Sequence, residues 1–169
     1  MEQIVEPAGK SDNNVRLLRF VREGKKEIAL VNFCTHPDVI GGHKISADWP
    51  GLTRTFVEAE HKDAHCILMN GFQGDTNHYN FFKGKDGCKK GYTHSNYMAR
   101  VITDTVNLIW DKIETKEKHT LYAEMRHVFN KCSTRGEEHY EECHAFYVKY
   151  KSGDYSVKKT PSGIDLPEA

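Results

Sequence analysis

The sequence lacks several features that would assign it to a familiar class of protein. Its 169 residues contain no run of 18 apolar residues, so no transmembrane helix is expected. The 24 basic residues are balanced by 24 acidic ones, which argues against a nucleic-acid-binding domain. Residues 1–10 have no apolar stretch of the signal-peptide type. We therefore expect a single soluble, globular domain with a small-molecule partner rather than a nucleic acid.

Compact catalytic and metal-binding motifs are also missing. No HExxH, P-loop or GxSxG sequence occurs, and none of the five cysteines forms a CxxC pair. Cys34 and Cys66 lie in apolar runs and are expected to behave as small core residues. This use of cysteine favours a reducing compartment such as the cytoplasm over a disulfide-linked, secreted fold.

Hydrophobic patterns predict an α/β fold in the first half of the chain. Residues 15–21 and 27–34 read as two strands of a hairpin, and the second is apolar nearly throughout, which predicts burial on both faces in the middle of a sheet. A helix that begins at Ser46 or Asp48 and a strand over 65–70 follow. This order is a βαβ unit, which joins parallel strands. We expect a mixed sheet with a central parallel βαβ unit, flanked by helices.

The second half of the chain has weaker signals. Residues 81–92 read as an exposed loop, and a strong amphipathic helix begins at Ser95. Alternating apolar and polar residues over 120–129 predict a strand with one wet face. Residues 137–150 read as a helix in which His139, Cys143 and His144 are solvated. The domain is expected to span 1–150, with a polar tail over 151–169.

The parallel strand pair places two chemistry-bearing loops at one edge of the sheet. The loops after strands 27–34 and 65–70 both follow carboxyl ends, and ligands of open α/β sheets bind at that edge. Imidazole and carboxylate groups together suit Zn²⁺ and related ions. We therefore expect one crevice to be lined by seven polar residues, namely His36, His43, Asp48, Gln73, Asp75, Asn77 and His78.

Each of these residues also has an ordinary structural interpretation. His36 could end a strand and hydrogen-bond a backbone carbonyl, and Asp48 could be only a helix N-cap. Asp75 could close an Asx-turn, and His78 could simply pack against neighbouring aromatic rings. Spacing alone leaves the structural and the catalytic interpretations open.

Three ordered motifs resemble the neutral/alkaline, non-lysosomal ceramidase family and its bacterial relatives. They are VNFCTHPDVIGG (31–42), ISADWPGLTRTFVE (45–58) and ILMNGFQGDTN (67–77). The family has a strand that ends in a His-Pro pair, a Ser-Ala-Asp or Ser-Asp segment that opens a helix, and a strand followed by a Gly-Asp loop. The resemblance covers about residues 15–110.

The resemblance implies a zinc-dependent amidohydrolase that cleaves N-acyl bonds such as that of ceramide, a sphingolipid. It implies that His36 is a zinc ligand and that Asp75 lies in the family's Gly-Asp loop. Asp48 and Asp75 would orient the metal or shape the pocket. Asn77 occupies the place of the family's nucleophilic serine. Since asparagine cannot attack a carbonyl in that way, a metal-bound water is the expected nucleophile.

The chain departs from the family in its metal ligands. The family's first zinc histidine lies in an upstream His-Thr-His-Ser-Gly-type segment that does not occur here, and its downstream Glu and Tyr ligands have no clear counterpart. We therefore expect a fragment of the catalytic domain, with an incomplete zinc site and little activity by itself. Exposed edges of a cut sheet would favour a homo-oligomer. A non-catalytic small-molecule or metal-binding module, and a hydrolase of a different substrate, remain alternatives.

Overall fold

The structure, a computed structural model, describes residues 9–129 and 139–156. Contacts within the chain divide it into two units between His119 and Thr120. The first unit contains three strands and two helices, namely β1 (Arg16–Phe20), β2 (Glu27–Phe33), α1 (Asp48–Glu60), β3 (Ala64–Asn70) and α2 (Tyr92–Trp110). A 3₁₀ segment, η1 (Phe81–Gly87), precedes α2, and the second unit contains α3 (Tyr140–Lys151).

The three strands form one mixed sheet in the order β1-β2-β3. β1 pairs antiparallel with β2, and Leu18 lies opposite Leu30. Gly24, with a φ of +63°, lies in the connection between these two strands and adopts a conformation that is easy only for glycine. β2 pairs parallel with β3, and Leu30 lies opposite Ile67. The predicted hairpin, the central βαβ unit and the α/β class are all confirmed.

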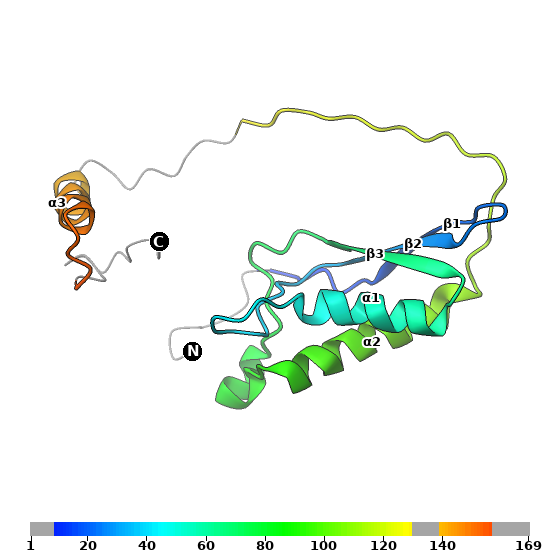
Figure 1. Ribbon diagram of the computed structural model, residues 1–169, viewed down its shortest axis with the longest axis horizontal. Helices are drawn as coiled ribbons and strands as arrows, with labels where there is room; N and C mark the ends of the chain where they lie inside the picture. The colour runs from blue at the N-terminus through cyan, green and yellow to red at the C-terminus, as the bar shows by residue number, and fades with distance from the viewer. Residues whose placement is uncertain (1–8, 130–138, 157–169) are drawn as a thin grey trace. The chain divides into compact units, whose positions relative to one another are not determined.

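Both helices of the first unit cover the same face of the sheet (Figure 1). In β3 the side chains alternate, so that Ala64 and Cys66 are buried beneath the helices while His65 and Ile67 are exposed. Val57 of α1 and Val106 of α2 are completely buried in the same core. The core is therefore a layer between one face of the sheet and two helices.

The opposite face of the sheet is only partly buried, which corrects one prediction. β2 lies in the middle of the sheet as expected, but Ile28 and Leu30 are half-buried rather than buried. Leu18 and Ile67, which lie opposite Leu30 on the two neighbouring strands, are 52% and 48% exposed. An apolar strand was interpreted as buried on both faces, whereas in the described residues α1 and α2 lie on a single face.

A polar network joins the sheet to α2 at the end where β2 begins. The Arg19 guanidinium makes two-pronged hydrogen bonds of 2.8–2.9 Å to the Glu27 carboxylate and donates a 2.9 Å bond to the Trp110 carbonyl. It also lies over the Trp110 ring, 4.4 Å from the ring centre. His61 stacks on the same indole, with ring centres 3.6 Å apart. This network fixes the end of α2 against β1.

Three predictions for the second half need correction. Residues 120–129 form no strand within the described chain; Glu124 instead joins Tyr122 and Arg126 in an extended, exposed segment. The predicted loop contains η1, and α2 begins at Tyr92 rather than Ser95. α3 begins at Tyr140 and has no buried residue. Residues 157–169 of the expected polar tail lie outside the described residues.

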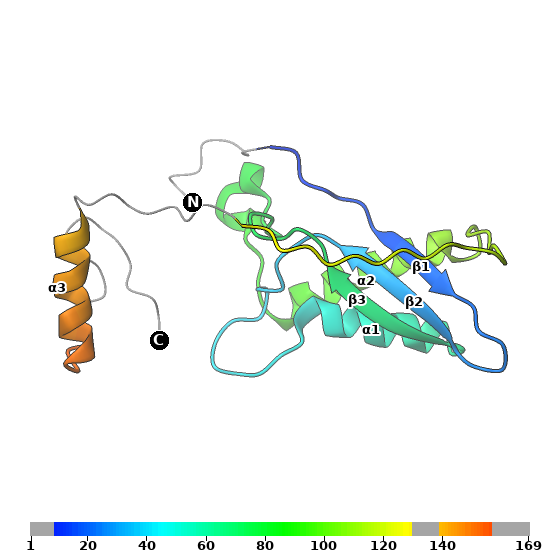
Figure 2. The ribbon, with the colours of Figure 1, turned by 90° about the horizontal axis from the view of Figure 1, so that it is seen from above.

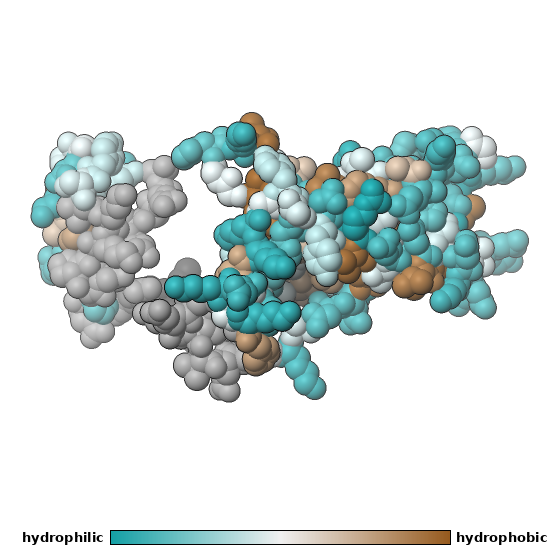
Figure 3. Space-filling view, turned by 90° about the horizontal axis from the view of Figure 1, so that it is seen from below, coloured by the Kyte–Doolittle hydropathy of each residue, from teal (hydrophilic) through white to brown (hydrophobic). Residues whose placement is uncertain are grey.

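The surface on the side of the helices carries hydrophobic patches among mostly hydrophilic residues (Figure 3). Val101 and Leu108 of α2 are 46% and 67% exposed. Among the described residues, no helix combines the length and the apolar character needed to cross a lipid bilayer, as the sequence predicts.

Candidate functional site

The loops after β2 and β3 meet at one end of the sheet, as predicted. The carboxyl ends of both strands point the same way (Figure 2). The His36 N–H donates a 2.9 Å hydrogen bond to the Thr76 carbonyl, and the Gly71 N–H donates a 3.0 Å bond to the Phe33 carbonyl. At Gly71 a Cβ atom would lie 3.1 Å from the Cys34 Cβ, so the loops approach as closely as a glycine allows.

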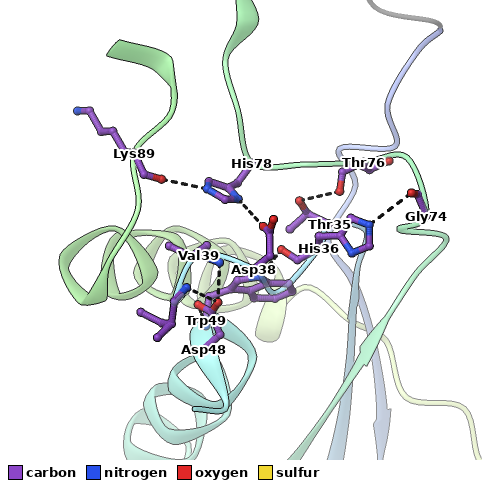
Figure 4. A network of polar contacts seen from close by, with 11 residues as sticks. Thr35, His36, Asp38, Val39, Asp48, Trp49, Gly74, Thr76, His78 and Lys89 are labelled. Atoms are coloured by element: carbon purple, nitrogen blue, oxygen red, sulfur yellow. Dashed lines mark hydrogen bonds and ion pairs between the residues drawn. The ribbon is translucent and has the colours of Figure 1, made fainter. Parts of the chain in front are cut away.

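His36 is held at this junction by its backbone. Its carbonyl accepts a 3.3 Å hydrogen bond from the Trp49 indole N–H, so that α1 also fixes its position (Figure 4). The ring Nε2 lies 3.4 Å from the Gly74 carbonyl, and the residue is partly exposed. The predicted metal ligand therefore faces the Gly-Asp loop, although its nearest polar neighbour is a backbone oxygen.

Asp48 anchors the loop that carries His36. Its buried carboxylate accepts hydrogen bonds from the Val39 N–H at 2.7 Å and the Ile40 N–H at 3.0 Å, and one from the Trp49 N–H at 2.6 Å (Figure 4). Its φ of +47° is in the left-handed region, which aspartate tolerates better than most residues. The helix N-cap is Ala47, without a side-chain capping bond. Asp48 thus holds the loop against the start of α1.

Asp38, which the sequence motifs did not single out, joins two residues of the opposite loop. Its carboxylate lies 3.1 Å from His78 Nδ1. With its amide nitrogen turned toward Asp38, Asn77 donates hydrogen bonds of 3.0 and 3.3 Å to the two carboxylate oxygens. Its position two residues after His36, on the same loop, was the one feature of the sequence that could have pointed to Asp38 as a site residue. Asn77, which the sequence resemblance sets at the place of a nucleophilic serine, is thus an amide that contacts a carboxylate.

His78 connects three loops. Its side chain is only 2% exposed, and its Nε2 lies 2.9 Å from the Lys89 carbonyl in the segment before α2 (Figure 4). Nδ1 is within ion-pair distance of Asp38, but the two groups are not aligned as a hydrogen bond. The ring also packs on Tyr79, with centres 4.4 Å apart. Packing against an aromatic neighbour, one of the two interpretations that the sequence left open for His78, is present together with polar contacts that the sequence did not reveal.

An open cavity of about 740 Å³ lies beside this junction. Asp75 and Asn77, both exposed, line it together with His78. Of the seven residues expected in one crevice, His36, His43, Asp48 and Gln73 do not line the cavity. Its other walls include residues of β2 and the first turns of α2, namely Phe33, His94, Tyr97 and Met98. The cavity is large enough for a small organic molecule.

His94, which sequence reasoning also missed, is the second histidine of this cavity. Burial lowers the pKa of its ring below the ordinary value of 6.5, and the nearby His78 and Lys89 lower it further, while Asp48 opposes the shift. Its ring centre lies 5.4 Å from that of His78. It sits in a first helical turn that followed an apparently exposed loop, so the sequence offered no signal for it.

The described residues do not make a complete metal site. Within 9–129 and 139–156, no group of three or more His, Cys, Asp or Glu side chains is arranged to hold an ion. Zinc sites normally have three or four protein ligands. His36 alone therefore fits one position of a zinc site and does not fit a whole one.

Comparison with protein-family models, with curated proteins and with solved structures found no match to this chain.

Proposed function

We propose that this chain is part of a zinc-dependent amidohydrolase that resembles neutral ceramidase and cleaves N-acyl amide bonds. One observation supports the proposal best. The His-Pro loop and the Gly-Asp loop, which carry two of the three family-like motifs, are joined by the hydrogen bond from His36 to Thr76. They adjoin a cavity of suitable size for a substrate.

The residues would have separate tasks in such an enzyme. His36 would supply one metal ligand, and the remaining ligands would come from outside the described residues. Asp75 and Asn77 line the cavity and would contact the substrate. Asp48 would act through the loop, since its carboxylate is occupied by backbone N–H groups. When bound, zinc would polarise the amide carbonyl or activate water.

Hydrolysis under metal control tests this proposal. The protein, purified in the form in which its own cells make it, is assayed on short- and long-chain N-acyl amides, including sphingoid, sugar and peptide-like amines. We expect hydrolysis that a chelator abolishes and added zinc restores. His36→Ala should abolish it, whereas His43→Ala, which changes an exposed histidine of the same loop, should leave it intact. Failure to cleave any N-acyl amide in the presence of zinc would overturn the proposal.

A binding module without turnover is the second candidate, and the open cavity favours it. Because a ligand that binds only the native state raises the melting temperature, thermal unfolding separates the two cases. A zinc-dependent rise that His36→Ala removes supports the metalloenzyme. A rise with a small amide, unaffected by zinc and without hydrolysis, supports the binding module.

A further inference from the structure

His94 is positioned by ring contacts and not by hydrogen bonds. It stacks on Tyr97 with ring centres 5.8 Å apart and planes inclined by 17°, and it lies beside His78. Within the part of the chain that the structure describes, neither of its ring nitrogens has a hydrogen-bond or ion-pair partner. A ring held in place with both nitrogens available is suited to contact a ligand.

Two neighbouring side chains of the cavity, His78 and Asn77, are directed at Asp38. His78 Nε2 lies 2.9 Å from the Lys89 carbonyl, and its Nδ1 lies 3.1 Å from the Asp38 carboxylate without an aligned hydrogen bond. The Asn77 amide nitrogen is directed at Asp38. Asp75 is exposed and accepts only a long 3.4 Å hydrogen bond from the Thr76 hydroxyl. Within the described residues, His94 is thus the cavity histidine whose two ring nitrogens both lack a polar neighbour, so one of them can accept a proton or a hydrogen bond.

The surroundings of His94 keep its ring neutral near pH 7. Burial is the first cause of its lowered pKa, and the facing groups His78 and Lys89 add to it. The negative charge of Asp48 acts in the opposite direction and raises this pKa. A neutral imidazole has one donor and one acceptor nitrogen, whereas a protonated ring can only donate. Protonation would therefore remove the acceptor.

We propose that His94 is the acceptor in this cavity for a proton or hydrogen bond of an N-acyl amide ligand. The ligand class rests on the proposed function. In hydrolysis, the oxygen of a water molecule would form a bond to the amide carbon and a water proton would pass to His94. The proton would then move to the amide nitrogen as the carbon–nitrogen bond breaks, which yields a carboxylic acid and an amine.

Binding of N-acetylethanolamine, a small soluble N-acyl amine, to the full chain tests the proposal. Its dissociation constant and the NMR signal of the His94 ring are measured from pH 5 to 8. We expect the probe to shift this signal and to bind more weakly as His94 becomes protonated. His94→Ala should weaken binding roughly two- to tenfold, the range for one lost hydrogen bond, and should remove the pH dependence.

Two variants separate this role from a structural one. His65→Ala changes an exposed histidine on the opposite face of the sheet and should bind like the wild type. His94→Gln keeps an acceptor that does not titrate, so it should restore part of the binding with a flat pH profile. It also provides the test if His94→Ala fails to fold.

The outcomes distinguish this proposal from the amidase assignment. Binding that depends on His94, without hydrolysis, supports the acceptor role and counts against the amidase. Hydrolysis and binding that His94→Ala leaves unchanged overturn the acceptor role and leave the amidase standing. No binding of the probe by the wild type also overturns the acceptor role.

Discussion

Replacement of Asp48 should destabilise the protein strongly, because its buried carboxylate accepts hydrogen bonds from backbone N–H groups of the loop. Asp48→Ala removes the acceptor of the Val39 and Ile40 N–H groups, at 2.7 and 3.0 Å. A hydrogen bond to a charged group contributes about 1.5–3 kcal/mol. The buried carboxylate itself costs free energy to desolvate, which offsets part of this sum. We expect a loss of about 3–5 kcal/mol in the free energy of unfolding.

Two further substitutions divide this loss into its parts. Asp48→Gly removes the same hydrogen bonds but relieves the backbone at φ +47°, so it should be about 1 kcal/mol more stable than Asp48→Ala. Asp48→Asn keeps one acceptor oxygen and tolerates the left-handed conformation, so it should lose about half as much.

Urea denaturation with a common slope measures these differences. Asp75→Ala is the matched control, since it removes an exposed carboxylate and should change stability by no more than about 0.5 kcal/mol. The reasoning would be refuted if Asp48→Ala lay within 1 kcal/mol of the wild type, or if Asp48→Gly were less stable than Asp48→Ala.

Three other predictions concern the first unit. Arg19→Ala should lower the free energy of unfolding, measured with urea, by about 2–4 kcal/mol, because it breaks a largely buried, two-pronged contact with Glu27 and uncovers Trp110. Arg22→Ala, at an exposed site, is the control, and equal losses in the two variants would contradict this prediction. Gly71→Ala should lower the free energy of unfolding by about 1–2 kcal/mol in the same assay, because an added Cβ would lie close to Cys34. Gly74→Ala, with open space around it, should not destabilise the protein. A larger loss for Gly74→Ala than for Gly71→Ala would be inconsistent with the loop geometry. Burial, with a contribution from Glu58, raises the pKa of the Cys66 thiol from 9.0 to about 11. The unfolded chain therefore releases this proton at a lower pH than the folded protein, and stability should fall as pH rises from 9 to about 11. The urea midpoint should fall more for the wild type than for Cys66→Ala over this range, and parallel pH profiles would refute this prediction.

Local patterns in the sequence were sufficient to predict how the sheet is connected. The short apolar run of β3, the turn at Gly24 and the βαβ order each follow from neighbouring residues, and together they place His36 near the Gly-Asp loop. The strand predicted over 120–129 was wrong, because alternation describes the two faces of a strand but does not provide a partner for its backbone.

The detailed contacts of the site depend on residues that are distant in the sequence. Asp38 is part of the site because it contacts Asn77 and His78 on another loop. His94 is part of the site because it lines a cavity whose walls come from several segments of the chain. Such contacts have no periodic signature, so a single sequence cannot reveal them. The assignment of His36 to zinc stays a prediction.

The contact of Arg19 with Glu27 and Trp110 lies at the end of the sheet opposite the cavity. Substitutions that strengthen or weaken that end are separated from the cavity by the length of the strands, and effects at well-separated sites usually add. Substitutions at the Arg19 end can therefore change the thermal stability of the protein without altering the properties of the cavity at the other end.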